Sequence, residues 1–223
     1  MRTIVTDTNR AYLAPAEYVD SDHPTIRARA ESLSADQDTD ADKARAIYYF
    51  VREIVYHAAD FADLDSFRAS RVLAAGYGYC VAKASLFAAL CRAAGLPARL
   101  LFADVSNHIA TPKSREKMGT DSYAWHGYNE VLVEHRWLKV SPTFNASLCR
   151  KLGVPPLEFD GRSDALLQAY DEAGRAFMRY DKFHGAFHDV PARFLSAEMQ
   201  RLYPETCAAI RAGEFPLPVE GKL

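Results

Sequence analysis

The chain has 223 residues, 49% of them hydrophobic, and a formal net charge of −2. This is enough apolar material for a substantial core, and the small net charge gives no electrostatic reason to expect nucleic acid or an anionic membrane as a partner. No run of about 18 apolar residues is present, and polar residues interrupt the N-terminus too early for a signal-peptide core. We expect one cytoplasmic domain over residues 1–223, and the sequence indicates no oligomeric state.

The cysteines lack the density and the pairing pattern of a disulfide scaffold, and none forms a CxxC pair typical of zinc sites; they are Cys80, Cys91, Cys149 and Cys207. The first two are about 16 Å apart along an expected helix, which is too far for a bridge. We expect reduced thiols.

Two helices are expected in the first quarter of the chain. The first begins around Pro24, in a position that proline favours, and runs to about Leu33. The second begins near Asp40, whose charge suits a first helical turn, and ends near Tyr56.

Two glycines and a helix pattern flank Cys80. Gly76 and Gly78 relax the backbone just before it, and strong helix formers occupy residues 81–94. Cys80 should therefore lie at or near a helix N-terminus. There the helix macrodipole and the unpaired N–H groups favour a thiolate, and they offer donors to an oxyanion forming beside the sulfur.

The expected helix is apolar along almost its whole length. Polar side chains interrupt it only at Lys83, Ser85 and Arg92, which indicates a helix buried on most sides. Gly95 and Pro97 place its end near residue 94.

Three strands are expected next. Residues 98–105 are typical of a buried strand, and residues 125–133 and 137–140 of an antiparallel hairpin with a tight turn at 134–136. Between them, residues 106–122 have the composition of a long exposed loop, of the kind that often borders a functional cleft.

The last third carries two further helix patterns, at residues 164–180 and 197–212. Helices before and after a compact run of strands indicate the α+β class.

A nucleophilic cysteine needs a base, and the base needs a group that orients it. His126 is the first choice among the histidines, because only it begins a strand expected to return alongside the core. His135 falls in the hairpin turn and His108 opens the long loop, so both should be solvated. Trp125 and Tyr79 could line the cleft, although packing is the simpler explanation for both.

His184 and His188 have the four-residue spacing of a metal-binding pair on one helix face. Gly185 disfavours that helix, and the nearby carboxylates are limited to Asp181 and Asp189. We expect no metal ion and no cofactor.

Four motifs follow one another along the chain: Tyr77-Gly78-Tyr79-Cys80, Gly95-Leu96-Pro97-Ala98-Arg99, Trp125-His126-Gly127-Tyr128-Asn129-Glu130-Val131 and Trp137-Leu138-Lys139-Val140-Ser141-Pro142-Thr143. Together they resemble the transglutaminase-like core of the papain-like superfamily, over about residues 40–145. The resemblance implies a buried, nucleophile-bearing helix packed on a small antiparallel sheet, with additional N-terminal helices and a C-terminal helical extension over about 146–223. It also implies Cys80 as nucleophile and His126 as base, the roles that the residues themselves favour.

The orienting residue departs from the family pattern, which usually has Asp directly before the Pro-Thr pair. This chain has Ser141 there, which could bond the Nδ1–H of His126 but brings no charge. If the hairpin turn holds residues 135 and 136, Asn145 falls opposite His126, and papain-like proteases use Asn in this role. The other candidates are Asp121, Asp160 and Asp164.

These features predict a cysteine-dependent acyl-transfer enzyme that acts on amide bonds, with a protein, a peptide or a small amide as substrate. It would hydrolyse the amide or transamidate a glutamine-like donor through a thioester, and hydrolysis is the more typical of bacterial single-domain chains. One alternative is a catalytically impaired binding module that kept the fold. Another is an enzyme similar to arylamine acetyltransferases, although their Arg-Gly-Gly-X-Cys pattern is absent.

Overall fold

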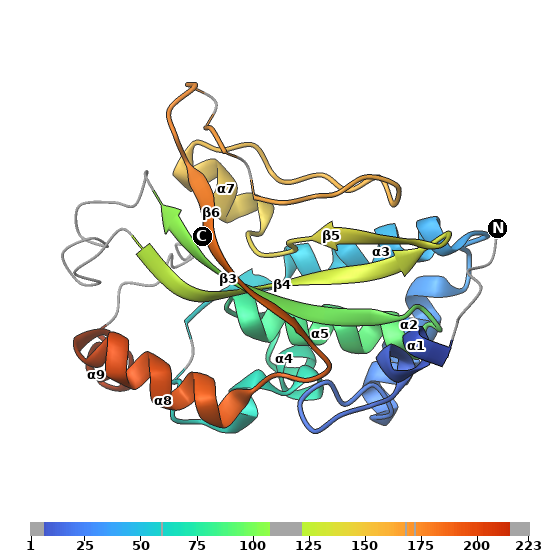
Figure 1. Ribbon diagram of the computed structural model, residues 1–223, viewed down its shortest axis with the longest axis horizontal. Coiled ribbons are helices and arrows are strands. Elements are labelled where there is room, and N and C mark those ends of the chain that lie inside the picture. Colours follow the sequence, from blue (N-terminus) through green and yellow to red (C-terminus); the bar gives the residue numbers. More distant parts are fainter. Residues whose placement is uncertain (1–6, 59, 108–121, 168, 172, 215–223) are drawn as a thin grey trace.

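A four-stranded antiparallel sheet lies at the centre of the computed structural model, which describes residues 7–58, 60–107, 122–167, 169–171 and 173–214 (Figure 1). Its strand order is β5-β4-β3-β6, so that β3 pairs with a neighbour on both sides. The strands are β3 (Ala98–Asn107), β4 (Ser122–Val133), β5 (Arg136–Val140) and β6 (Met178–Phe187). The three strands that the sequence predicts are confirmed, and so is the α+β class.

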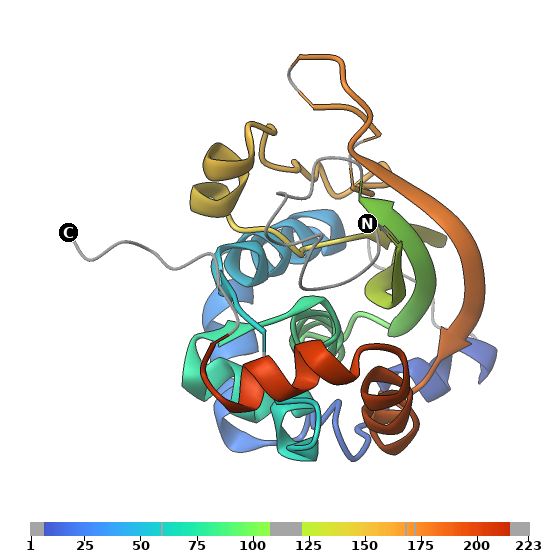
Figure 2. The ribbon, with the colours of Figure 1, turned by 90° about the vertical axis from the view of Figure 1, so that its left-hand side faces the viewer.

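Helices pack on one face of this sheet around α5 (Figure 2). They are α2 (Pro24–Ser34), α3 (Asp40–Glu53), α4 (Ala69–Ala75) and α5 (Cys80–Ala93). The shorter elements of the N-terminal half are α1 (Asp7–Arg10), η1 (Ala11–Leu13), η2 (Leu64–Phe67) and a parallel pair of strands, β1 (Val55–Tyr56) and β2 (Tyr77–Gly78). The later helices are α7 (Ala146–Leu152), α8 (Ala192–Leu202) and α9 (Pro204–Arg211). Within the described ranges, no helix has both the length and the apolar character needed to cross a membrane.

The central helix α5 is buried without interruption from Val81 to Arg92, as its apolar sequence predicts. Arg92 lies in the core because its guanidinium donates to three backbone carbonyls, those of Ala14, Ala98 and His188. These bonds tie the N-terminal segment and the end of β6 to the same helix. Every one of the guanidinium nitrogens is therefore satisfied inside the protein.

The prediction of a helix at residues 164–180 is wrong. Ala165 bridges to Val140 and Tyr170 to Ala176, after which the chain enters β6. Strand β6 pairs along the edge of β3 that would otherwise be free, so long-range pairing overrides a local preference for helix. The expected C-terminal helical extension is therefore partly a strand of the central sheet.

The prediction of one helix at residues 197–212 is also corrected. Two helices, α8 and α9, meet at Tyr203, and Pro204 begins the second of them. Proline cannot donate an N–H to the preceding turn, but it suits the first position of a new helix.

Lys83 is the buried cation of the first turns of α5. Its exposed fraction is 0%, and its Nζ donates to the carbonyls of Arg52 (2.9 Å) and Ile54 (2.6 Å), where α3 ends. Burial lowers the pKa of Lys83 to about 7. An uncharged amine keeps two N–H groups, so both hydrogen bonds survive the loss of the proton.

We expect the wild-type protein to gain stability relative to Lys83→Met as the pH rises above 7. The folded state loses the Lys83 proton near pH 7, whereas the unfolded chain keeps it to about pH 10.4, so the unfolded state binds more protons in this window. The difference in free energy of unfolding should rise with pH by at most about 1.4 kcal/mol per unit. Urea unfolding of both proteins from about pH 6 to pH 10 measures it, and a constant difference contradicts the lowered pKa.

Candidate active site

Cys80 is the first residue of α5, and the local sequence explains why the helix begins there. Gly76 closes α4 with a φ of 72°, β2 follows, and Tyr79 is an extended N-cap. The thiol therefore lies at the positive end of the central helix. Cys80 is partly exposed, whereas the other three cysteines are buried.

Strand β4 touches the first turn of α5 at Gly127. A Cβ at this position would lie 2.8 Å from the Cα of Val81, closer than a real Cβ comes to its neighbours. Glycine is therefore required for the strand backbone to rest on the residue that follows Cys80. Because Gly127 directly follows His126, this contact brings the predicted nucleophile and the predicted base to one part of the fold.

Burial dominates the electrostatics of the thiol and raises the pKa of Cys80 to about 11. The backbone N–H groups of Gly127, Val81 and Cys80 itself act in the opposite direction but do not offset the burial. The sulfur is thus a protonated thiol at neutral pH, surrounded by donors. Donors in this arrangement can stabilise negative charge that develops next to the sulfur.

His126 pairs with Ala103 of β3, and only 6% of its surface is exposed. Burial lowers the pKa of its imidazole to about 4, so the ring is neutral at pH 7. In the described structure, His126 and Cys80 make no hydrogen bond to each other. The resting pair is a neutral thiol with a neutral imidazole, and not a thiolate with an imidazolium.

Ser141 is the polar partner of His126. Its Oγ lies 3.3 Å from the Nε2 of His126 and 3.0 Å from the Oγ1 of Thr143, in a buried chain of three side chains. The expected contact with Nδ1 is wrong, because the ring presents its other nitrogen to Ser141. Nδ1 therefore stays available for a second partner.

The prediction that sets Asn145 opposite His126 is wrong. The turn between β4 and β5 holds Glu134 and His135, both with positive φ, 47° and 69°. The register of β5 on β4 is consequently two positions away from the expected one. The expected turn and the observed turn both hold two residues, but the observed one lies one position earlier, which shifts every pair by two.

The amide of Asn145 has partners of its own. Its Oδ1 accepts the backbone N–H of Tyr56 at 3.1 Å, and its Nδ2 donates to the Oγ of Ser147 at 2.7 Å. These bonds join the end of β1 to the start of α7. Asn145 thus supports the segment beside Cys80 and does not orient His126.

The candidate carboxylates are also engaged elsewhere. Asp160 accepts the N–H groups of Arg162 and Ser163, and Asp164 accepts the N–H of Lys139. Asp121, like His108, lies outside the described residues.

The two aromatic candidates differ in their surroundings. Tyr79 is only 7% exposed, and its ring packs edge-on against Phe61 and Phe67, so packing accounts for most of its surface. Trp125 is partly exposed beside His126, where it can border the site.

Tyr180 of β6 is a residue of the site that the sequence does not predict, because the expected helix at residues 164–180 includes it. Its ring centroid lies 5.9 Å from that of His126, and its buried hydroxyl has no hydrogen-bond partner among the described residues. Burial raises its pKa above the ordinary range. The aromatic residues repeated along Phe177–Phe187 favour a strand and were the available signal.

His184 and His188 do not lie on a helix. The Nε2 of His184 is 2.7 Å from the Oδ1 of Asp104, and the Nε2 of His188 is 2.8 Å from the carbonyl oxygen of Ala11. Among the residues that the structure describes, no group of three or more His, Cys, Asp or Glu could hold a metal ion.

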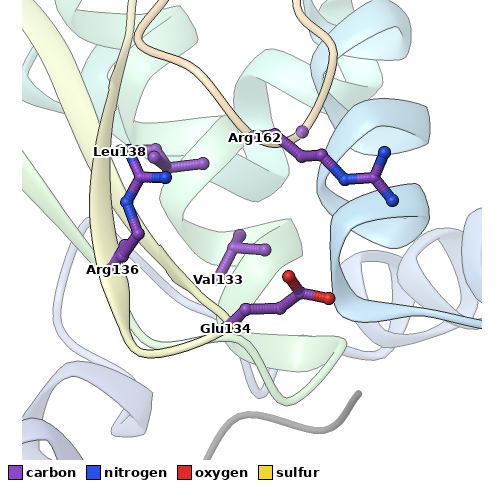
Figure 3. A pocket seen from close by; sticks show the side chains of 6 residues that line it. Val133, Glu134, Arg136, Leu138 and Arg162 are labelled. Atoms are coloured by element: carbon purple, nitrogen blue, oxygen red, sulfur yellow. The ribbon is translucent and has the colours of Figure 1, made fainter.

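A small hollow lies at the turn between β4 and β5, far from this chemistry (Figure 3). Its volume of about 110 Å³ is below the roughly 300–1,000 Å³ of ordinary ligand pockets. Arg136 and Arg162 on its walls point away from each other. Val133, which also lines it, is about 23 Å along the strand from His126, so the hollow is not part of the active site.

The profile of the transglutaminase-like superfamily matches residues 27–142, slightly more than half of the chain. Among solved structures, the chain is similar to a candidate cysteine protease from Cytophaga hutchinsonii, with 18% identity and a TM-score of 0.50 over 82% of this chain and 55% of that one. This likeness concerns the fold.

The chain is also similar to the periplasmic domain of TgpA from Pseudomonas aeruginosa, with 24% identity and a TM-score of 0.45 over 66% of this chain and 51% of that one. The chain thus spans about half the length of these two structures. No curated protein sequence matches it.

We expect the rate at which iodoacetamide alkylates Cys80 to rise with pH. The midpoint of this rise should lie near pH 11, above the ordinary thiol pKa of about 8.5. The reason is that burial keeps the sulfur protonated while His126 is already neutral. Peptide mapping by mass spectrometry separates Cys80 from the three buried cysteines.

The matched variant His126→Gln should leave this midpoint in place, because a neutral imidazole does not stabilise the resting thiolate. A rate plateau between about pH 5 and pH 8 that disappears in His126→Gln would instead reveal a preformed ion pair.

Proposed function

The chain belongs to the transglutaminase-like superfamily, and from this premise we propose that it is an enzyme that transfers the acyl group of an amide through Cys80. The observation that carries the proposal is the contact of Gly127, the residue after His126, with the first turn of α5, which begins at Cys80. The substrate is a protein, a peptide or a small amide. The free cysteines support a reducing compartment such as the cytoplasm.

The resting charges suggest how the first step proceeds. Since the thiol and the imidazole are both neutral, the Nδ1 of His126 takes the thiol proton as the sulfur attacks the carbonyl carbon, in the manner of general base catalysis. The carbon–sulfur bond forms, and the carbonyl electron pair moves to oxygen. The N–H groups of Gly127, Val81 and Cys80 are the proposed donors to that oxyanion.

The second step returns the proton. The imidazolium of His126 protonates the leaving amine as the carbon–nitrogen bond breaks, which leaves a thioester on Cys80. Water, or an amine in a transamidation, then attacks the thioester with His126 again as base. We favour hydrolysis.

Ser141 would orient the imidazole during these steps by accepting the Nε2–H of His126. It supplies a dipole where a carboxylate would supply a charge, so it stabilises the imidazolium less. The presence of Ser141 in place of a carboxylate also favours the second candidate function, a binding module that kept the fold and lost most of its catalytic activity.

A substrate screen separates the two functions. We expect the wild-type protein to turn over at least one substrate among amide, ester and glutamine-donor compounds, and Cys80→Ala to be inactive, because the other three cysteines are buried. His126→Gln should lower kcat by roughly 10²–10⁴-fold. Cys207→Ala, which removes a buried thiol on α9, is the control and should keep wild-type activity. Equal turnover by wild type and Cys80→Ala would leave the binding module as the remaining function.

The role of Ser141 has a test of its own. We expect Ser141→Ala to lower kcat by about three- to tenfold, the equivalent of one neutral hydrogen bond. Ser141→Asp should raise the pKa of His126 from about 4 toward its ordinary value of about 6.5, because a carboxylate favours the charged ring. NMR titration of the His126 ring measures this, with Cys207→Ala as the control. A His126 pKa that is the same in Ser141→Asp and in wild type would remove Ser141 from the mechanism.

A further inference from the structure

A β-bulge directly precedes His126. Ala103 pairs with His126 and Val105 with Tyr123, so two residues of β4 oppose the single residue Asp104 of β3. The second of these two is Trp125, whose φ is 58°. A bulky residue in the left-handed region is a genuine outlier, and such outliers persist only where the surroundings hold them.

The N–H groups that the bulge removes from the ladder are satisfied by side chains. Asp104 accepts the N–H of Trp125 at its Oδ1, at 3.1 Å, and the hydroxyl of Tyr203 accepts the N–H of Ala124 at 2.8 Å. Backbone donors freed by the bulge thus have partners that are specific to this conformation.

A second bulge delivers His184 to the same place. Phe102 pairs with Gly185 and Ala103 with Phe183, which leaves His184 of β6 outside the ladder. Its Nε2 lies 2.7 Å from the same Oδ1 of Asp104. An ionised carboxylate only accepts hydrogen bonds, so this nitrogen carries the hydrogen.

The indole of Trp125 is enclosed on several sides. The ring of His184 stacks on it, with a centroid distance of 3.9 Å and an interplanar angle of 13°. Phe194 of α8 meets it edge-on at 4.8 Å and Phe102 lies at 5.9 Å. Asp104 therefore holds the backbone of Trp125, while His184 holds its side chain and is itself held by Asp104.

We propose that Asp104 and His184 are positioning residues that keep Trp125 in its left-handed conformation and thereby fix where the strand segment that begins at His126 enters the ladder. This inference rests on the proposed function, since it assigns a means of placing the catalytic base. Without the bulge, regular alternation would carry the side chains on one side of residue 125 to the opposite face of the sheet. The bulge thus adjoins the pair of His126 with Ala103, and the Asp104–His184 pair holds the bulge.

The test compares variants of Asp104 and of His184 with control variants of a neighbouring aspartate and a neighbouring histidine. All are made in a Trp137→Phe background, where Trp125 is the only tryptophan. Asp104→Ala removes both bonds, whereas Asp104→Asn keeps the one oxygen that accepts from both the N–H of Trp125 and the Nε2–H of His184. His184→Gln removes the stacked ring. Asp181→Asn and His188→Gln are the controls, because their side chains bind Ser106, Arg179 and Ala11 instead.

We expect Asp104→Ala and His184→Gln to lower kcat by about tenfold, as a small displacement of a catalytic group does, while KM changes less than about twofold. In the same two variants, the NMR chemical shifts of the His126 ring and the emission maximum of Trp125 should differ from those of the Trp137→Phe background. Asp104→Asn should recover most of kcat and return the His126 resonances toward wild type. The controls should match wild type in every measurement.

Three outcomes overturn the proposal: unchanged His126 resonances in Asp104→Ala and His184→Gln, equal losses in the controls, or no recovery in Asp104→Asn. The first of these outcomes includes a Trp125 spectrum that moves while the His126 resonances stay, since the pair would then hold the indole alone. If no substrate is turned over by the wild-type protein, the proposed function fails, and the His126 resonances alone decide this inference.

Discussion

The close approach of β4 to the first turn of α5 at Gly127 is the constraint on which the site depends. It leaves no room for a side chain between the strand and Val81, and it puts His126 one residue away from the point of contact. Burial shifts the pKa of the thiol and that of the imidazole in this part of the fold.

Desolvation sets the charge state of the pair. Burial raises the pKa of Cys80 against the effect of the helix N-terminus and its N–H donors, and it also lowers the pKa of His126, so both groups are driven toward their neutral forms. A carboxylate on the far side of the imidazole would oppose this, but Ser141 contributes only a dipole. Reactivity in such a site depends on charge that develops during the reaction and on donors already in place to receive it.

Irregular pairing shapes the part of the sheet around the base. The bulges at Trp125 and His184 lie on strands that flank β3, and Asp104 of β3 bonds to both residues. A left-handed tryptophan costs of the order of 1–3 kcal/mol, which its carboxylate partner and its stacked ring help to offset. The C-terminal third takes part in this arrangement, because β6 supplies His184 and α8 supplies Phe194.

The sequence by itself determined the elements that depend on local physics: the helix that begins at Cys80, the hairpin of β4 and β5, the proline-initiated α2 and the choice of His126 as the residue to examine. It did not determine β6, because residues 164–180 have local helix propensity. The sequence also does not indicate which edge of β3 needs a partner strand. Asn145 was misplaced because the turn lies one residue earlier than expected, and the nitrogen facing Ser141 could not be read from a pattern. Tertiary structure decided these points, because register, bulges and desolvation arise only when distant segments pack together.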